Sequence, residues 1–220
     1  MTDCAVGRDT MSDFFLKYPV IVLDFDGVII DSAKIKTDAF AELFNNNKEL
    51  IEFHKKNTGI SRFVKFRYYY ENILKEPVSD EKLDELNKKF NKIVMDKIKD
   101  TGLISGIKEF LERYWLDKKL YICSGAPINE VMEIVKSKDI IKYFKGIYGQ
   151  PGEKNDILNE IADIEKVKKD RILFIGDGLS DYEAAKKTGI DFIAFIHNEN
   201  KDYFEKLDVC KIYESFLSVL

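Results

Sequence analysis

Two carboxylates stand on alternate positions in Asp24-Phe25-Asp26-Gly27, directly after the apolar run Val20–Leu23. The run is rich in β-branched residues, which is typical of a strand buried on both faces of a parallel sheet. Open α/β sheets bind their ligands at the carboxyl ends of the strands. Because a buried charge is costly unless it is paired, holds a metal or does chemistry, these two acids predict an active site at the end of this strand.

Polar residues also follow three other strand-like segments: Ser124 and Gly125 after 120–123, Lys154 after 146–148, and Asp177 and Asp181 after 172–175. Because the carboxyl ends of parallel strands meet at one edge of a sheet, we expect these side chains to converge on the two acids of the first strand. Phosphoryl transfer needs such a set. Carboxylates hold Mg²⁺, a lysine and backbone donors counter the charge of the phosphoryl group, and a carboxylate can act as the nucleophile.

The elements that would position these residues alternate along the chain. A further strand-like run occupies 192–196, and amphipathic helical patterns occupy 107–115, 129–137, 155–164 and 181–188. This alternation predicts an α/β fold with a doubly wound, Rossmann-like parallel sheet. The segment 33–101 interrupts it with helical patterns only, one of which begins at Ser79. We therefore predict a flexible extension over 1–18, a catalytic core formed by 19–32 and 102–220, and an inserted α-helical cap over 33–101.

Composition narrows the class of protein further. The chain has 220 residues, a formal net charge of −4, 45% hydrophobic and 34% charged residues, which predicts a soluble globular protein with no nucleic-acid or membrane partner. The chain has three cysteines, Cys4, Cys123 and Cys210, and they form no CxxC pair. This pattern argues against a disulfide framework or a zinc site and predicts a protein of the reducing cytoplasm. With only His54 and His197 as histidines, catalysis must rely on carboxylates.

Taken in order, the four clusters resemble the motifs of the haloacid dehalogenase-like phosphohydrolase superfamily. Asp24-Phe25-Asp26-Gly27-Val28-Ile29 resembles the first motif, Ser124 the second, Lys154 the third, and Gly176-Asp177-Gly178-Leu179-Ser180-Asp181 the fourth. The match extends over about 19–196. The helical insert resembles the cap of the phosphoglycolate phosphatase and β-phosphoglucomutase branch.

The resemblance implies a role for each of these residues. Asp24 would attack phosphorus and become an aspartyl-phosphate, and Asp26 would protonate the leaving alcohol and then deprotonate the attacking water. Mg²⁺ would be held by Asp24, Asp177 and the backbone carbonyl of Asp26, with Asp181 in or directly behind the metal shell. The phosphoryl oxygens would be bound by Ser124, Gly125 and Lys154.

The loop Thr58-Gly59-Ile60-Ser61-Arg62 is similar to a cap loop in which the sugar phosphomutases of this branch hold a remote phosphate. It makes Arg62 and Ser61 candidates for substrate specificity, since a guanidinium binds anions bidentately. The alternative is that Ser61 caps the next helix and Arg62 is a surface residue. Lys34 and Lys36 could also face the cleft.

We therefore predict a Mg²⁺-dependent phosphatase for a small phosphorylated metabolite, a sugar phosphate or a phospho-organic acid, acting as a monomer or weak homodimer. A sugar phosphomutase is the alternative, although Gly125-Ala126-Pro127 lacks its Ser-Lys-Asn triplet and Lys36 stands where β-phosphoglucomutase has a histidine. A non-catalytic phospho-aspartate signalling module would lack both the insert and the acid at position 26. A sugar-nucleotide transferase with a DxD metal pair would not explain Ser124 and Lys154.

Overall fold

The computed structural model describes residues 11–57, 60–196 and 204–219. Its centre is a six-stranded sheet in the order β3-β2-β1-β4-β5-β6, and every pair of neighbouring strands is parallel. The strands are β1 (Val20–Leu23), β2 (Lys119–Pro127), β3 (Gly146–Gln150), β4 (Ile172–Gly176), β5 (Asp191–Phe195) and β6 (Lys211–Tyr213). The five predicted strands and the α/β fold class are confirmed. The sixth strand, β6, was not predicted.

The strand order places a topological switch point at the centre of the sheet. From β1 the chain moves outward to β2 and β3, then returns to the other side of β1 with β4. Crossover connections leave β1 and β4 in opposite directions, which opens a crevice at their carboxyl ends where open α/β sheets bind ligands.

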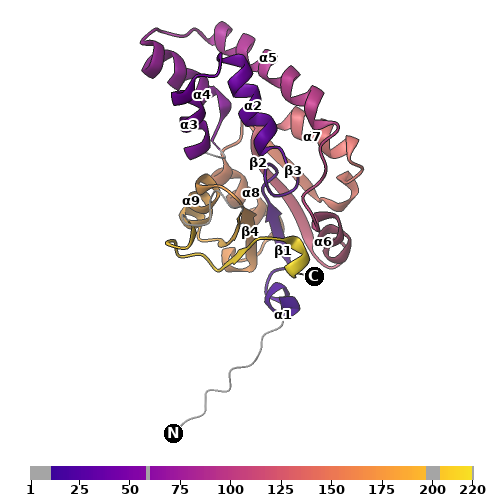
Figure 1. Cartoon of the computed structure of the whole chain (residues 1–220). Coiled ribbons are helices and arrows are strands. Elements are labelled where there is room, and N and C mark those ends of the chain that lie inside the picture. The colour runs from indigo at the N-terminus through magenta and orange to yellow at the C-terminus, as the bar shows by residue number, and fades with distance from the viewer. Residues whose placement is uncertain (1–10, 58–59, 197–203, 220) are drawn as a thin grey trace.

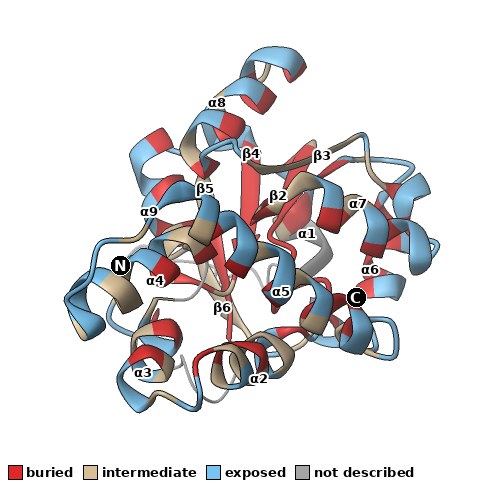
Figure 2. Cartoon of the chain, turned by 90° about the horizontal axis from the view of Figure 1, so that it is seen from above, coloured by how far each residue is buried: buried red, intermediate tan, exposed pale blue. Residues whose placement is uncertain are grey.

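Helices cover both faces of the sheet (Figure 1). One face carries α6 (Ile107–Tyr114) and α7 (Ile128–Ser137), and the other carries α8 (Lys154–Glu165) and α9 (Leu179–Thr188). Alternate residues of β1 join the two apolar layers: Ile21 and Leu23 pack on the first, Val20 and Val22 on the second. All four are fully buried, which explains why this strand contains no polar residue. Seen from above, the buried residues gather along the strands and the exposed ones on the outer helices (Figure 2).

The described part of 33–101 contains helices and no strand, as predicted. It forms α2 (Ala33–Leu43), α3 (Lys48–Lys56), α4 (Arg62–Tyr68), a π-helical turn η1 (Tyr69–Leu74) and α5 (Asp80–Ile98). We call these helices the cap; Figure 1 shows them grouped beyond the end of the sheet. The Ser79 hydroxyl accepts the Lys82 N–H at 3.3 Å, which confirms the predicted start of α5. The exact boundaries 33 and 101 between cap and core stay a prediction.

The core of the cap is a cluster of aromatic rings. Phe40, Phe66 and Phe90 are buried, and their ring centroids lie 4.8–6.0 Å apart. Phe44 extends the cluster toward Tyr69 of η1. The rings join α2, α4 and α5, so that the cap has an apolar centre of its own.

The N-terminal extension predicted for 1–18 is too long. Residues 1–10 lie outside the described residues, whereas Met11–Leu16 form the helix α1. Phe15 and Tyr18 are each 1% exposed, and the Phe15 ring packs against Phe110 and Tyr114 of α6. Aromatic burial therefore ties this segment to the core. Among the described helices, none is long and apolar enough to cross a membrane.

Replacing Phe66 by alanine tests the aromatic centre of the cap. The variant should lose about 3–5 kcal/mol of unfolding free energy in urea, because a fully buried ring is removed from a packed cluster. Val64→Ala, on the same helix but at a position that is 51% exposed, should change it by no more than about 0.5 kcal/mol. Equal losses in the two variants would contradict this description of the cap.

Candidate active site

Two acids stand at the switch point, each directly after a central strand. Asp24 follows β1 and is 2% exposed; Asp177 follows β4. The Asp24 N–H donates to the Ile175 carbonyl of β4 at 2.8 Å, which extends the pairing of the strands up to the first acid. The sheet itself therefore brings together two residues that lie far apart in sequence.

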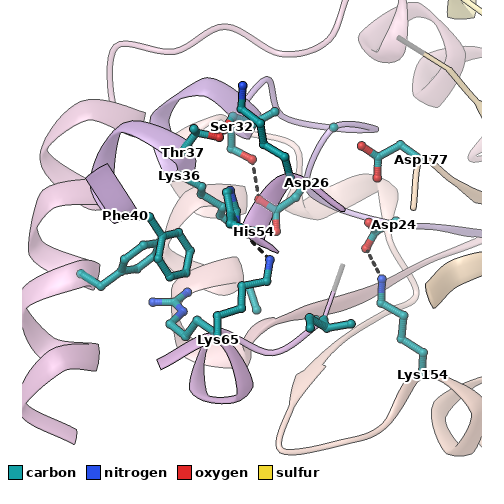
Figure 3. Close-up of a pocket in the computed structure, with 18 residues that line it drawn as sticks. Asp24, Asp26, Ser32, Lys36, Thr37, Phe40, His54, Lys65, Lys154 and Asp177 are labelled. Atoms are coloured by element: carbon teal, nitrogen blue, oxygen red, sulfur yellow. Dashed lines mark hydrogen bonds and ion pairs between the residues drawn. The ribbon is translucent and has the colours of Figure 1, made fainter. Parts of the chain in front are cut away.

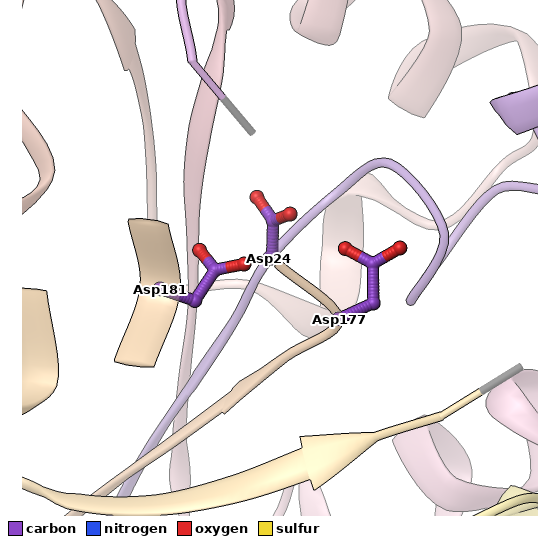
Figure 4. A group of neighbouring side chains, drawn as sticks. All are labelled: Asp24, Asp177 and Asp181. Atoms are coloured by element: carbon purple, nitrogen blue, oxygen red, sulfur yellow. The ribbon is translucent and has the colours of Figure 1, made fainter. Parts of the chain in front are cut away.

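A third acid completes a carboxylate cluster. Asp181, in the first turn of α9, joins Asp24 and Asp177, and one oxygen of each lies within 4.8 Å of the others (Figure 4). Burial and then the charge of Asp181 raise the pKa of Asp24 to about 7, and burial and the charge of Asp24 raise that of Asp177. A divalent cation would relieve this repulsion. The donor set is all oxygen, which fits a hard cation.

Gly27 allows the first motif to pass close to the fourth. Its φ is +77°, and a Cβ atom there would lie 2.0 Å from Oδ2 of Asp177. Any other residue would both strain the backbone and displace this carboxylate. The glycine of the first motif is therefore required for the cluster to form.

Lys154 lies between two of the three acids. It is the first residue of α8, and its Nζ donates to Oδ1 of Asp24 at 3.1 Å and to Oδ1 of Asp181. Burial alone would lower the pKa of Lys154, but the charges of Asp181 and Asp24 outweigh it and raise that pKa. The other Asp181 oxygen accepts the Gly178 N–H at 3.0 Å. Asp181 thus positions both the lysine and the loop of the fourth motif.

Asp26 lies in a different environment from Asp24. Its carboxylate pairs with Lys36 and accepts a hydrogen bond from the Ser32 hydroxyl. Burial would raise its pKa, but the charge of Lys36 and these hydrogen bonds outweigh burial and hold the pKa below its usual range. The two acids of the first motif are therefore chemically distinct: the pKa of Asp24 is raised by burial beside other carboxylates, and that of Asp26 is lowered beside a cation.

The second motif lies where β2 is irregular. The pairing of β2 with β3 shifts register between Cys123 and Pro127. In this stretch Ser124 is fully buried, and its Oγ accepts the Ala126 N–H at 3.0 Å. Gly125 and Ala126 line a cavity at the end of the sheet. The structure thus brings the second motif to the same edge as the acids.

The cavity lies between core and cap and has a volume of about 120 Å³. Figure 3 shows its walls: Asp24, Asp177 and Lys154 on the side of the sheet, with Phe40, His54 and Lys65 on the side of the cap. Lys36 and Arg62 also line it. The acidic wall of the cavity thus faces a wall rich in cations.

The two cap candidates from the sequence connect cap to core. The Arg62 guanidinium makes a two-pronged ion pair with Glu130 of α7, with Nη1 3.0 Å from Oε1, and lies 4.7 Å from the centre of the Phe90 ring. Arg62 is 7% exposed, so the alternative that it is a surface residue is wrong. The alternative that Ser61 caps the next helix is confirmed, and Ser61 also donates to Gln150 at 3.3 Å.

Sequence reasoning missed Lys65 and gave His54 no place in the site. Lys65 is 3% exposed, and its Nζ lies 2.9 Å from Nδ1 of His54. The available signal was spacing, since Lys65 follows Arg62 by three positions and shares its helix face. In a chain with 35 lysines and arginines, that signal did not stand out.

The fold and site define an α/β protein with an acidic centre at its switch point, closed over by helices. The family model for haloacid dehalogenase-like hydrolases matches residues 21–195, and the chain belongs to this family. The resemblance noted in the sequence is thereby confirmed, and the chain is a hydrolase of this family. No curated protein matches it.

Solved structures share the whole architecture. A haloacid dehalogenase-like family hydrolase from Streptococcus pneumoniae has 21% identity and a TM-score of 0.72, covering 93% of this chain and 97% of that one. A predicted phosphoglycolate phosphatase from Haemophilus somnus has 16% identity and a TM-score of 0.74, covering 92% and 96%. CbbY from Rhodobacter sphaeroides, solved with xylulose 1,5-bisphosphate, has 16% identity and a TM-score of 0.73, covering 90% and 95%. At these identities the likeness establishes the fold.

Replacing Lys154 by methionine tests the charge balance of the cluster. At pH 8 without divalent ions, the variant should lose about 3–5 kcal/mol of unfolding free energy, because two buried carboxylates lose their cation. Added Mg²⁺ should restore part of the loss. Lys56→Met, which removes an exposed cation of α3, is the control. Unchanged stability of Lys154→Met in urea would mean that the lysine does not balance the acids.

Proposed function

We propose that this hydrolase is a Mg²⁺-dependent phosphatase that hydrolyses a small phosphorylated metabolite through an aspartyl-phosphate on Asp24. One observation carries the proposal: a buried carboxylate at the switch point pairs with a buried lysine and lies within 4.8 Å of two further acids, at the wall of a cavity. Such a set matches the charge pattern of phosphoryl transfer, with a nucleophile, a cation for the phosphoryl oxygens and oxygen ligands for a metal.

In this reaction an Asp24 carboxylate oxygen forms a bond to phosphorus while the bond from phosphorus to the leaving oxygen breaks. Asp26 delivers a proton to that leaving oxygen. Water then attacks phosphorus, Asp26 takes its proton, and the bond between Asp24 and phosphorus breaks to release phosphate. The pairing with Lys36 suits Asp26 to the second step. For the first step it must gain a proton, which the negative phosphoryl group favours by raising its pKa.

The metal would be held by Asp24, Asp177 and the backbone carbonyl of Asp26, with Asp181 fixed behind them by Lys154 and Gly178. When bound, Mg²⁺ would neutralise charge on the phosphoryl group and orient it. Ser124, Gly125 and Lys154 would bind the remaining phosphoryl oxygens. Arg62 and Ser61 stay candidates for substrate specificity.

The size of the cavity, about 120 Å³, supports a small substrate, either a sugar phosphate or a phospho-organic acid. Two structural neighbours, a predicted phosphoglycolate phosphatase and a protein bound to xylulose 1,5-bisphosphate, are consistent with this range. The cysteine pattern supports a cytoplasmic location. We propose a monomer or weak homodimer.

Replacing Asp24 by asparagine tests the nucleophile. Wild-type protein with Mg²⁺ should release phosphate from p-nitrophenyl phosphate, and Asp24→Asn should reduce kcat by at least about a thousandfold, since an amide cannot form the phosphoryl intermediate. Asp163→Asn, which removes an exposed carboxylate of α8, should retain full activity. Persistent activity of Asp24→Asn would rule out the mechanism. Assaying isomer formation in parallel on sugar phosphates would detect a phosphomutase instead.

Metal binding can be tested without turnover. At about 100 times its Kd, Mg²⁺ stabilises a protein by roughly 2.7 kcal/mol, which should raise the Tm of the wild type by about 5–10 °C. Asp177→Asn should lose most of this shift because it removes a carboxylate of the cluster, while Asp163→Asn should keep it. An equal shift in Asp177→Asn, measured by scanning fluorimetry, would place the ion elsewhere.

A further inference from the structure

The cap wall of the cavity carries four cations, Lys36, Lys55, Arg62 and Lys65, of which Lys55 is exposed to solvent. Lys36 pairs with Asp26, and Arg62 pairs with Glu130. For Lys65, no carboxylate lies within ion-pair distance in the part of the chain that the structure describes. The Lys65 Nζ instead lies at hydrogen-bond distance from Nδ1 of the His54 ring.

Lys65 is nevertheless among the most buried charged residues of the protein, at 3% exposure. Burying an ammonium group costs several kcal/mol unless an opposite charge compensates it. The His54 ring cannot provide that charge. Burial and the neighbouring Lys65 charge lower the pKa of His54 to about 2, which leaves the ring neutral, so that its Nδ1 can accept a hydrogen bond from Lys65 but supplies no negative charge.

The surroundings make this arrangement less favourable still. Burial, and then the positive charge of Lys36, lower the pKa of Lys65 to about 7; the negative charge of Asp26 offsets part of this, and Arg62 adds to the lowering. The Phe40 ring, 5.7 Å from the Lys65 Nζ, is a weak partner. The free protein thus buries a lysine whose charged form is disfavoured and which no carboxylate pairs in the described residues, and an anion that arrives from outside would favour that charged form.

We propose that Lys65, oriented by His54, binds a second anionic group of the substrate, so that the substrate is a doubly anionic metabolite carrying a phosphoryl group and a separate carboxylate or phosphate. This inference rests on the proposed phosphatase function. Lys65 and His54 lie across the cavity from Asp24 and Lys154 (Figure 3). The phosphoryl group would lie at the acidic wall with its metal, and the second anion at the cap wall.

In this structure Arg62 joins the cap to the core and is not available to bind an anion directly. Both of its terminal nitrogens bind Glu130, so its charge is already compensated. Lys36 is likewise held by Asp26. Lys55 is exposed to solvent, so among the cations that line the cap wall Lys65 is the buried one whose pairing with substrate would break no existing ion pair in the described residues.

The test measures binding in the Asp24→Asn background with Mg²⁺, so that no turnover occurs. Two probe pairs differ in the second anion: xylulose 1,5-bisphosphate against xylulose 5-phosphate, and phosphoglycolate against ethylene glycol monophosphate. Titration calorimetry gives the Kd ratio within each pair. At least one pair should favour the doubly anionic member, and adding Lys65→Met should reduce that preference by about 10- to 100-fold, as for the loss of one charge-assisted hydrogen bond.

Two controls separate the anion site from a structural role. Lys65→Met keeps the length of the side chain and removes an uncompensated charge, so its unfolding free energy in urea should be equal to that of the parent or higher. Lys56→Met changes the net charge equally at an exposed position of α3 and should leave the Kd ratios unchanged. A preference unaffected by Lys65→Met, or no preference in either pair, overturns the proposal.

Failure of the anion site and failure of the proposed function give different results. Phosphate release from p-nitrophenyl phosphate by the wild type, with no Lys65-dependent preference for doubly anionic probes, would reject the subsite alone. A Lys65-dependent preference in binding, with no phosphate released from any compound, would reject the phosphatase and leave the subsite standing.

Discussion

The arrangement of the molecule depends on three carboxylates, two of them buried and one partly buried, that lie together at the carboxyl ends of β1 and β4. Asp24, Asp177 and Asp181 repel one another in a place that water reaches poorly, and each nearby feature reduces that cost. Lys154 places one positive charge between two of them. Gly27 gives the third room to approach. What is left is a site with excess negative charge, and a divalent cation together with a phosphoryl group would complete it.

The cap is the electrostatic counterpart of this site. Its cavity wall contributes Lys36, Arg62 and Lys65, whereas the sheet contributes the acids. Opposite charges across a cavity of about 120 Å³ interact more strongly than they would in water, because few water molecules remain to screen them. The residues that the cap contributes to the cavity wall thus set the charge that a substrate would meet at its far end. A substrate with one anionic group would have a binding partner on one wall only, and a substrate with two would have a partner on each wall.

The parts of this site that could be predicted from sequence are those encoded locally. Asp24 and Asp26 follow an apolar run that can only be a buried strand, and the other motifs follow runs of the same kind. The strand β6 lacks such a run and is only half-buried, which is why periodicity did not reveal it. Arg62 and Glu130 are 68 positions apart in the sequence, and they lie in the cap and in the core respectively. The sequence around neither residue indicates that the two form a pair. Lys65 and His54 are similarly hidden, since their burial is decided by the fold of the cap.

The Arg62–Glu130 pair also holds the cap against the core. It joins α4 of the cap to α7 of the core and is almost completely shielded from water, so opening the cap would separate two desolvated charges. Ser61 and Gln150 add a second polar contact across the same boundary. Arg62 lines the cavity and lies on the same helix as Lys65, about one turn before it. A second anion on Lys65 would therefore stabilise the helix that this ion pair holds against the core, which couples recognition of the far end of the substrate to the closed position of the cap.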